Sequence, residues 1–186
     1  MVRPVSTSPT LAPVPADLAQ LRRHESQRSL TFYGVASEHQ EYAGLPDGML
    51  SAHIGSLELH IGRLVAAHGI TELVTAGPDG YDGHPDHIAV HHAALSAART
   101  ALRAGLDVRL YALNNLHRGE VKVRGNTARK LGAMAFHVSQ TVGSDLLRWG
   151  GSDLYTPLII RGETYDVLSG DLLTDTTRTM ASDRAA

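Results

Sequence analysis

Helix-like and strand-like patterns alternate along the middle of this 186-residue chain, and this alternation most limits the folds that it can adopt. Apolar residues recur in residues 51–68 with the period of an amphipathic helix, at Ile54, Leu57, Ile61, Leu64 and Val65. Gly69 is suited to end this helix, because glycine tolerates the left-handed conformation of a C-cap. Residues 72–77 (ELVTAG) then predict a short, buried strand.

Further helices and strands are expected at similar lengths. Residues 87–104 (HIAVHHAALSAARTALRA) are rich in alanine and predict a helix, and residues 107–113 (DVRLYAL) alternate like a strand. Residues 17–32 and 126–140 (NTARKLGAMAFHVSQ) each predict one more helix, and TYDVL near the end predicts a strand. This order predicts an α/β fold with a mostly parallel sheet flanked by helices, in which sites form beyond the carboxyl ends of strands.

The two ends of the chain differ from this central part. Residues 1–16 contain four prolines with several Ser and Thr, which predicts a flexible lead-in. We expect a single domain in residues 17–170 and a tail in residues 171–186. Apolar runs are too short to cross a bilayer, and the N-terminus lacks the apolar core of a secretion signal, so we expect a cytoplasmic protein without a membrane span.

Composition excludes several classes of site. The chain has no cysteine, so disulfides and thiolate metal sites are ruled out, and any metal must be held by His, Asp or Glu. The formal net charge is −2 and the Lys and Arg residues are dispersed, so nothing predicts nucleic-acid binding. The oligomeric state has no signal in the sequence.

The segment YDGHPDHIAVHH, residues 81–92, contains four of the eleven histidines and directly follows the first expected strand. Gly83 permits a close approach of the backbone to a neighbouring group. Pro85 stiffens the loop between His84 and His87, which helps where side chains must be held in place. Its position at the carboxyl end of a strand favours a functional role for the segment.

Three interpretations of this segment are open. In the first, His87 is a zinc ligand, His84 is an acid–base or electrostatic group nearby, and Asp86 tunes one of them. In the second, His87 and His91 form a metal-binding pair one helical turn apart. In the third, Asp and His residues cap a helix and the remaining histidines face solvent. The strand-end position and the order Gly-His-Pro-Asp-His favour the first interpretation. It is preferred to the second because the Ala-rich sequence around His91 and His92 is typical of a packing surface.

The chain resembles the PIG-L (LmbE-like) family of zinc-dependent N-deacetylases in four motifs that occur in the family's order. These are R-x-x-E at Arg22 and Glu25, GLPDG at 44–48, GHPDH at 83–87 and AFHVSQ at 135–140. The resemblance implies a Rossmann-like fold and a hydrolase that cleaves a linear amide. Its partner would be a small molecule, an N-acetylated sugar, usually an N-acetylglucosamine conjugate.

The resemblance also implies roles for individual residues. His87 would be the metal ligand, His84 would stabilise the tetrahedral intermediate and protonate the leaving amine, and Asp86 would tune His84. Substrate-binding or site-proximal positions of the family are matched by Arg22, Asp47 and His137. A zinc ion polarises the acetyl carbonyl and lowers the pKa of its bound water, and a histidine with a pKa near the working pH can shuttle the proton.

One motif of the family has no counterpart in this sequence. The family's AHPDDE segment supplies two more metal ligands and the general base, whereas the only His-Pro-Asp here is residues 84–86. We therefore expect a fold without its first strand and an incomplete site for Zn2+ or another divalent metal, with little or no deacetylase activity. The alternative hypothesis is a non-catalytic remnant of the fold that binds a small ligand or a protein partner.

Overall fold

The computed structural model describes residues 17–114, 119–141 and 163–169. The chain divides into two compact units, each assembled from segments that are distant in sequence. The first unit comprises residues 1–40 and 127–152, and the second comprises residues 41–126 and 153–186. The expected boundaries of the lead-in, domain and tail stay a prediction.

The second unit contains a four-stranded sheet in the order β1-β2-β4-β3. Its strands are β1 Glu72–Thr75, β2 Arg109–Asn114, β3 Val121–Val123 and β4 Glu163–Leu168. β1 and β2 are parallel, with Leu73 opposite Leu110, whereas β4 runs antiparallel to both β2 and β3. The α/β class is confirmed, but the sheet is mixed rather than mostly parallel. The expected order of helices and strands predicts parallel pairing for TYDVL as well, but β4, which contains this segment, pairs antiparallel with both of its neighbours.

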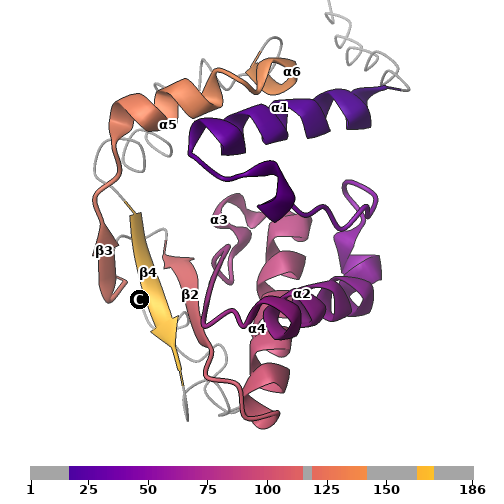
Figure 1. Ribbon diagram of the computed structural model, residues 1–186, viewed down its shortest axis with the longest axis vertical. Helices are drawn as coiled ribbons and strands as arrows, with labels where there is room; N and C mark the ends of the chain where they lie inside the picture. Colours follow the sequence, from indigo (N-terminus) through magenta and orange to yellow (C-terminus); the bar gives the residue numbers. More distant parts are fainter. Residues whose placement is uncertain (1–16, 115–118, 142–162, 170–186) are drawn as a thin grey trace, which may run out of the picture. The chain divides into compact units, whose positions relative to one another are not determined.

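Two helices of the second unit, α2 (Ile54–His68) and α4 (Pro85–Arg103), cover one face of this sheet (Figure 1). The short 3-10 helix η2 (Leu50–His53) precedes α2, and Gly69 ends α2 with a φ of 60°, as expected. The core between helices and sheet consists of Val65, Ala94, Leu95, Ala98, Ala101, Val108 and Leu110. Burying these apolar side chains is the main stabilising contribution in this unit.

The expectation that β1 is buried is wrong for half of its residues. Leu73 packs against the core and Thr75 is buried, whereas Val74 exposes 68% of its surface. Successive side chains of a strand point to opposite faces of the sheet. Because the two helices cover one face, every second side chain of β1 faces away from them.

The regular elements in the described residues of the first unit are all helices. They are α1 (Leu18–Phe32), the 3-10 helix η1 (Ser37–His39), α5 (Thr127–Met134) and α6 (Val138–Thr141). The ring of Phe32 lies 5.6 Å from that of Phe136, and a Cβ on Gly132 would stand 2.9 Å from the Phe32 ring. Glycine at 132 thus permits α5 to approach α1 closely.

The single helix expected over residues 126–140 is wrong, because the chain turns between α5 and α6. Phe136 N–H donates to Ala133 O and His137 N–H donates to Met134 O, which are the tighter i to i−3 bonds of a turn. This turn directs Phe136 towards Phe32 of α1. Tertiary packing therefore overrides a local sequence that favours a continuous helix.

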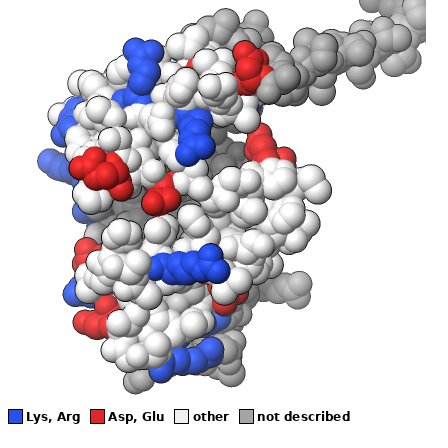
Figure 2. Space-filling model, turned by 45° about the vertical axis from the view of Figure 1, so that its right-hand side comes forward, with Lys and Arg blue, Asp and Glu red and all other residues white. Residues whose placement is uncertain are grey.

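None of the described helices combines the length and apolar character that a membrane span requires. On the face drawn in Figure 2, positive and negative side chains of the described residues are interspersed.

Candidate functional site

The GHPDH motif forms the N-terminal end of α4, directly after the short helix α3 (Gly80–Gly83). Pro85 is the first residue of α4, where its missing N–H costs no hydrogen bond. His84 is the N-cap residue, and its Nδ1 accepts a hydrogen bond from the Asp86 N–H at 3.2 Å. A neutral His84 ring that accepts at Nδ1 carries its proton on Nε2. The helix expected from residue 87 therefore begins two residues earlier.

His87 is oriented by α3, because its Nδ1 lies 3.0 Å from the carbonyl oxygen of Gly80. Donation from Nδ1–H to this carbonyl leaves the ring's lone pair on Nε2, which is the usual arrangement for a histidine that binds a metal. The rings of His84 and His87 lie 4.8 Å apart, and both residues are exposed. The two neighbouring imidazoles thus have opposite tautomers, with the proton on Nε2 in His84 and on Nδ1 in His87.

Asp86 is buried, and its carboxylate contacts the GLPDG motif. One carboxylate oxygen accepts from the Gly48 N–H at 2.6 Å, and the other accepts from the Leu50 N–H at 3.0 Å. Asp47, the predicted substrate-binding residue, precedes Gly48 in this turn and is exposed. Asp86 therefore contacts His84 through its backbone N–H and the GLPDG turn through its side chain.

His91 has a structural position in the core of the second unit. It is buried, and its Nδ1 lies 2.9 Å from the carbonyl oxygen of Ala76, just after β1. Burial lowers the pKa of His91, the contact with Ala76 opposes this effect, and the positive charges of His92 and Arg99 add to it. This environment fits the interpretation of His91 as a packing residue.

The described residues do not complete a zinc site. No group of three or more His, Asp or Glu side chains is placed to hold a metal ion in this part of the chain. A catalytic zinc ion normally has three protein ligands and an open position. His87 has the orientation of a ligand, but the donors near it are too few for a zinc ion to be held by these residues alone.

The first unit joins the R-x-x-E motif to the AFHVSQ motif. The carboxylate of Glu25 accepts from the Ser139 N–H at 2.7 Å and from the Ser139 hydroxyl at 2.6 Å, and Glu25 is only 6% exposed. The hydroxyl bond is the main cause that lowers the pKa of Glu25, the backbone bond and the charges of His137 and Arg22 also lower it, and burial opposes them. Glu25 is therefore a buried carboxylate whose two oxygens are bonded to one serine of the AFHVSQ motif.

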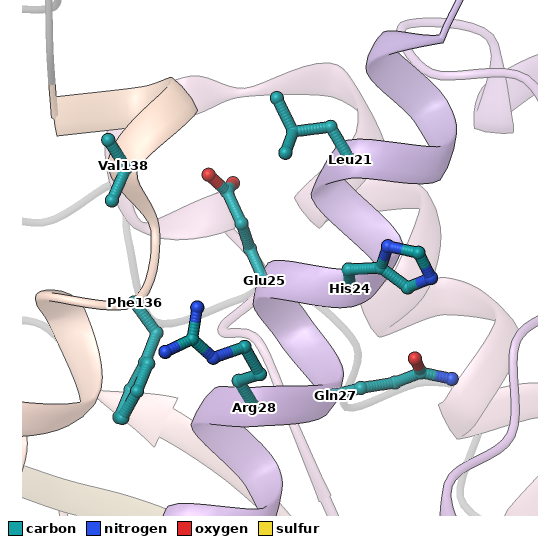
Figure 3. Close-up of a pocket in the computed structure, with 7 residues that line it drawn as sticks. All are labelled: Leu21, His24, Glu25, Gln27, Arg28, Phe136 and Val138. Carbon is teal, nitrogen blue, oxygen red and sulfur yellow. The ribbon is translucent and has the colours of Figure 1, made fainter.

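A surface pocket of about 540 Å³ lies beside Glu25 within the first unit (Figure 3). Figure 3 shows the Glu25 carboxylate directed between Leu21 and Val138. The guanidinium of Arg28 lies 5.0 Å from the centre of the Phe136 ring, which is within the range of a cation–π contact. The pocket thus combines one carboxylate, one guanidinium and an apolar wall.

The predicted site residues fall into two groups. His84, Asp86, His87 and Asp47 lie together in the second unit, whereas Arg22 and His137 lie in the first unit with Glu25. Sequence reasoning missed Gly80 and Ser139, which orient or bind the motif residues. A signal for Ser139 was present, because it belongs to AFHVSQ. Gly80 stands three residues before GHPDH and has no local signal for its role.

Comparison with known proteins gives a family and one relative. The PIG-L family model, described as GlcNAc-PI de-N-acetylase, matches residues 5–98, half of the chain. A protein from Catenulispora acidiphila named 1D-myo-inositol 2-acetamido-2-deoxy-alpha-D-glucopyranoside deacetylase 2 is 54% identical over 44 residues. This stretch covers 21% of the chain and 14% of the relative's length. No solved structure matches the chain.

Proposed function

Because the chain belongs to the PIG-L family, we propose that it carries part of a hydrolase site that removes an N-acetyl group from an N-acetylglucosamine-type conjugate. The observation that carries the proposal is the arrangement of His84 and His87, whose rings lie 4.8 Å apart with each Nδ1 held by a backbone group. Both Nε2 atoms then have defined and complementary hydrogen-bonding states. A cytoplasmic location stays a prediction from the sequence.

In this proposal His84 acts on the acetyl group. Its Nε2–H donates a hydrogen bond to the acetyl oxygen as that oxygen gains negative charge during attack by water. The Asp86 N–H holds the ring in the tautomer that this role needs. The proton for the leaving amine is the one that the attacking water loses, and His84 can carry it only as an imidazolium, whose Nδ1 no longer accepts from Asp86. Release of the amine is therefore coupled to the N-cap of α4.

We propose His87 as the metal ligand that this chain contributes, with its Nε2 as the donor atom. Zinc or another divalent ion would supply Lewis-acid chemistry when bound. The described residues fall short of the three ligands that such a site needs, so the other ligands have to come from outside them. Asp47, Arg22 and His137 are proposed to bind the sugar or lie near it.

The name of the relative suggests a test substrate, an N-acetylglucosaminide of inositol. Acetate release from this compound is measured in the presence of zinc for the wild-type chain and for His84→Ala and His87→Ala. Zinc binding is measured by calorimetry on the same proteins, with His92→Ala as a matched control on the same helix. Loss of zinc binding and of any acetate release in His87→Ala but not in His92→Ala supports the proposal.

The lack of a three-ligand group in the described residues favours a second candidate function, a non-catalytic sugar-binding domain. In that case the wild-type chain binds the inositol conjugate without releasing acetate at any zinc concentration. Binding that is equal in wild type, His84→Ala and His87→Ala, again without acetate, would rule out a catalytic role for both histidines in this chain.

A further inference from the structure

We infer that Asp86 is a positioning residue that fixes the GLPDG turn, and with it Asp47, on the N-terminal end of α4. The functional part of this inference rests on the proposed role of Asp47 in sugar binding. Asp86 is only 6% exposed, and an ionised carboxylate that is buried must be hydrogen-bonded to be tolerated. Its two oxygens meet this need with the N–H of Gly48 in the turn and the N–H of Leu50, the first residue of η2 directly after it.

Capping of α4 does not account for this arrangement. A carboxylate in the first turn of a helix can accept from amides of its own helix, and here His84 already accepts from the Asp86 N–H. The Asp86 carboxylate instead reaches residues that lie 36 and 38 positions earlier in the chain. Backbone donors have fixed positions, so two such bonds to one carboxylate define where the turn lies.

The turn itself is exposed. Pro46, Asp47, Gly48 and Met49 are all exposed, and the bond from Met49 N–H to Pro46 O is long, at 3.4 Å. Gly48 has a φ of 76°, a conformation that glycine adopts at little cost. The short, charge-assisted bonds to Asp86 are therefore strong restraints on a turn that would otherwise sample several conformations.

Asp86→Asn tests the inference, because an asparagine accepts one N–H and turns its own NH2 group towards the other. We expect the amide protons of Gly48 and Leu50 to exchange about 10- to 100-fold faster, as the loss of a hydrogen bond to a charged group allows. Asp107→Asn, which removes an exposed carboxylate in the same unit, should leave both rates unchanged. Unchanged rates in Asp86→Asn would overturn the inference.

Measuring the affinity for a sugar shows whether Asp86 positions Asp47 for ligand binding or only stabilises the turn. With N-acetylglucosamine as the probe, Asp86→Asn should raise Kd about tenfold, and it should add little in an Asp47→Ala background because both changes act on one contact. Faster exchange with an unchanged Kd would overturn the role in ligand binding. A third outcome is faster exchange in Asp86→Asn together with no binding of the sugar by the wild-type chain. This outcome would support the contact between Asp86 and the turn and would refute the proposed function.

The wild-type chain offers a measurement that does not depend on folding of a variant. Scalar couplings across hydrogen bonds, from the Gly48 and Leu50 amide nitrogens to the side-chain carboxyl carbon of Asp86, should be detectable by NMR. Their detection supports the inference. Well-resolved amide signals without these couplings overturn it.

Discussion

The Nδ1 atom of His87 lies 3.0 Å from the carbonyl oxygen of Gly80, and the Cα of Gly80 faces His87 and Ile88 at close range. A Cβ on Gly80 would stand 2.8 Å from the Ile88 side chain and 3.2 Å from the His87 Cβ. Glycine at this position therefore serves two purposes. It brings the carbonyl group to His87, and it leaves room for the first turn of α4 against α3.

The first prediction concerns Gly80→Ala, with Gly83→Ala as its matched control. Both glycines have positive φ, 66° and 79°, so an alanine costs about 1–2 kcal/mol of backbone strain at either site. The described residues leave open space around a Cβ at Gly83, so Gly80→Ala alone adds a clash, on the order of 1–3 kcal/mol more. Urea unfolding of the two variants measures the difference.

The same pair of variants reports on the orientation of His87. We expect the 15N shifts of the His87 ring to show the Nδ1–H tautomer in wild type and in Gly83→Ala, and a tautomer mixture in Gly80→Ala. Equal stability of the two variants, or an unchanged His87 tautomer in Gly80→Ala, would contradict the role given to Gly80. The close approach expected at Gly83 has no partner among the described residues and stays a prediction, whereas its positive φ favours glycine at this position.

The second prediction concerns the acid stability that Glu25 provides. The pKa of Glu25 is lowered from 4.5 in the folded chain, so its stabilising contribution is fully present above pH 4.5 and is lost as pH falls through the folded pKa. Glu25→Gln should therefore be less stable than wild type at pH 7, and the two should converge in acid. Unfolding curves between pH 7 and pH 3 measure this convergence.

Ser139→Ala removes one of the two hydrogen bonds that the Glu25 carboxylate accepts from Ser139. It removes the hydroxyl donor and keeps the backbone N–H, so its stability should lie between those of wild type and Glu25→Gln at neutral pH. Glu41→Gln, which removes an exposed carboxylate, is the control and should follow wild type. A stability gap for Glu25→Gln that stays constant down to pH 3 would show that ionisation of Glu25 does not stabilise the fold.

Local patterns predicted most of the secondary structure because the physical causes lie within a few residues. The apolar period of residues 51–68 and the Gly69 that ends them are confirmed by α2 and its left-handed C-cap. The break between α5 and α6 was missed, since its cause is the packing of Phe136 against Phe32, more than one hundred positions away in the sequence. The strand expected at TYDVL is confirmed by β4, but its antiparallel direction was not predicted, since the direction depends on pairing with the distant strands β2 and β3.

The candidate site shows the same limit. The order Gly-His-Pro-Asp-His predicted that His84 lies near His87, because Pro85 stiffens the short loop between them, and their rings are 4.8 Å apart. The contacts of Asp86 with Gly48 and Leu50, and those of Glu25 with Ser139, join distant segments. The spacing of residues within one segment carries no information about contacts with a distant segment. The sequence therefore identified candidate site residues but did not predict which residues they contact.

The third prediction concerns His91, which is buried and has a lowered pKa. As pH falls below the ordinary value of 6.5, the unfolded chain takes up a proton before the folded chain does. Stability is thus fully present above pH 6.5 and declines as pH falls towards the folded pKa. His92, Arg99 and Asp79 are the charged groups that modify this decline.

His91→Leu tests this titration. At pH 8 the variant should be less stable by about 1–3 kcal/mol, because the Ala76 carbonyl loses its donor. The gap to wild type should shrink below pH 6.5, since leucine cannot be protonated. His68→Leu, at an exposed position near the end of α2, is the control and should leave the pH profile of wild type largely intact. A gap that is the same at pH 8 and pH 5 would show that His91 does not titrate with unfolding.

The last prediction concerns self-association through β1, which lies at one edge of the described sheet. An exposed edge strand presents unpaired backbone groups, and lysine on such a strand opposes pairing with another chain. Val74 of β1 is 68% exposed, so Val74→Lys should slow aggregation of the concentrated protein. Val123→Lys on β3, the other edge strand, should change it less, because β3 has three residues and already carries Lys122. Light scattering over time compares the proteins, and an equal effect of both variants would mean that added charge, rather than the β1 edge, controls association.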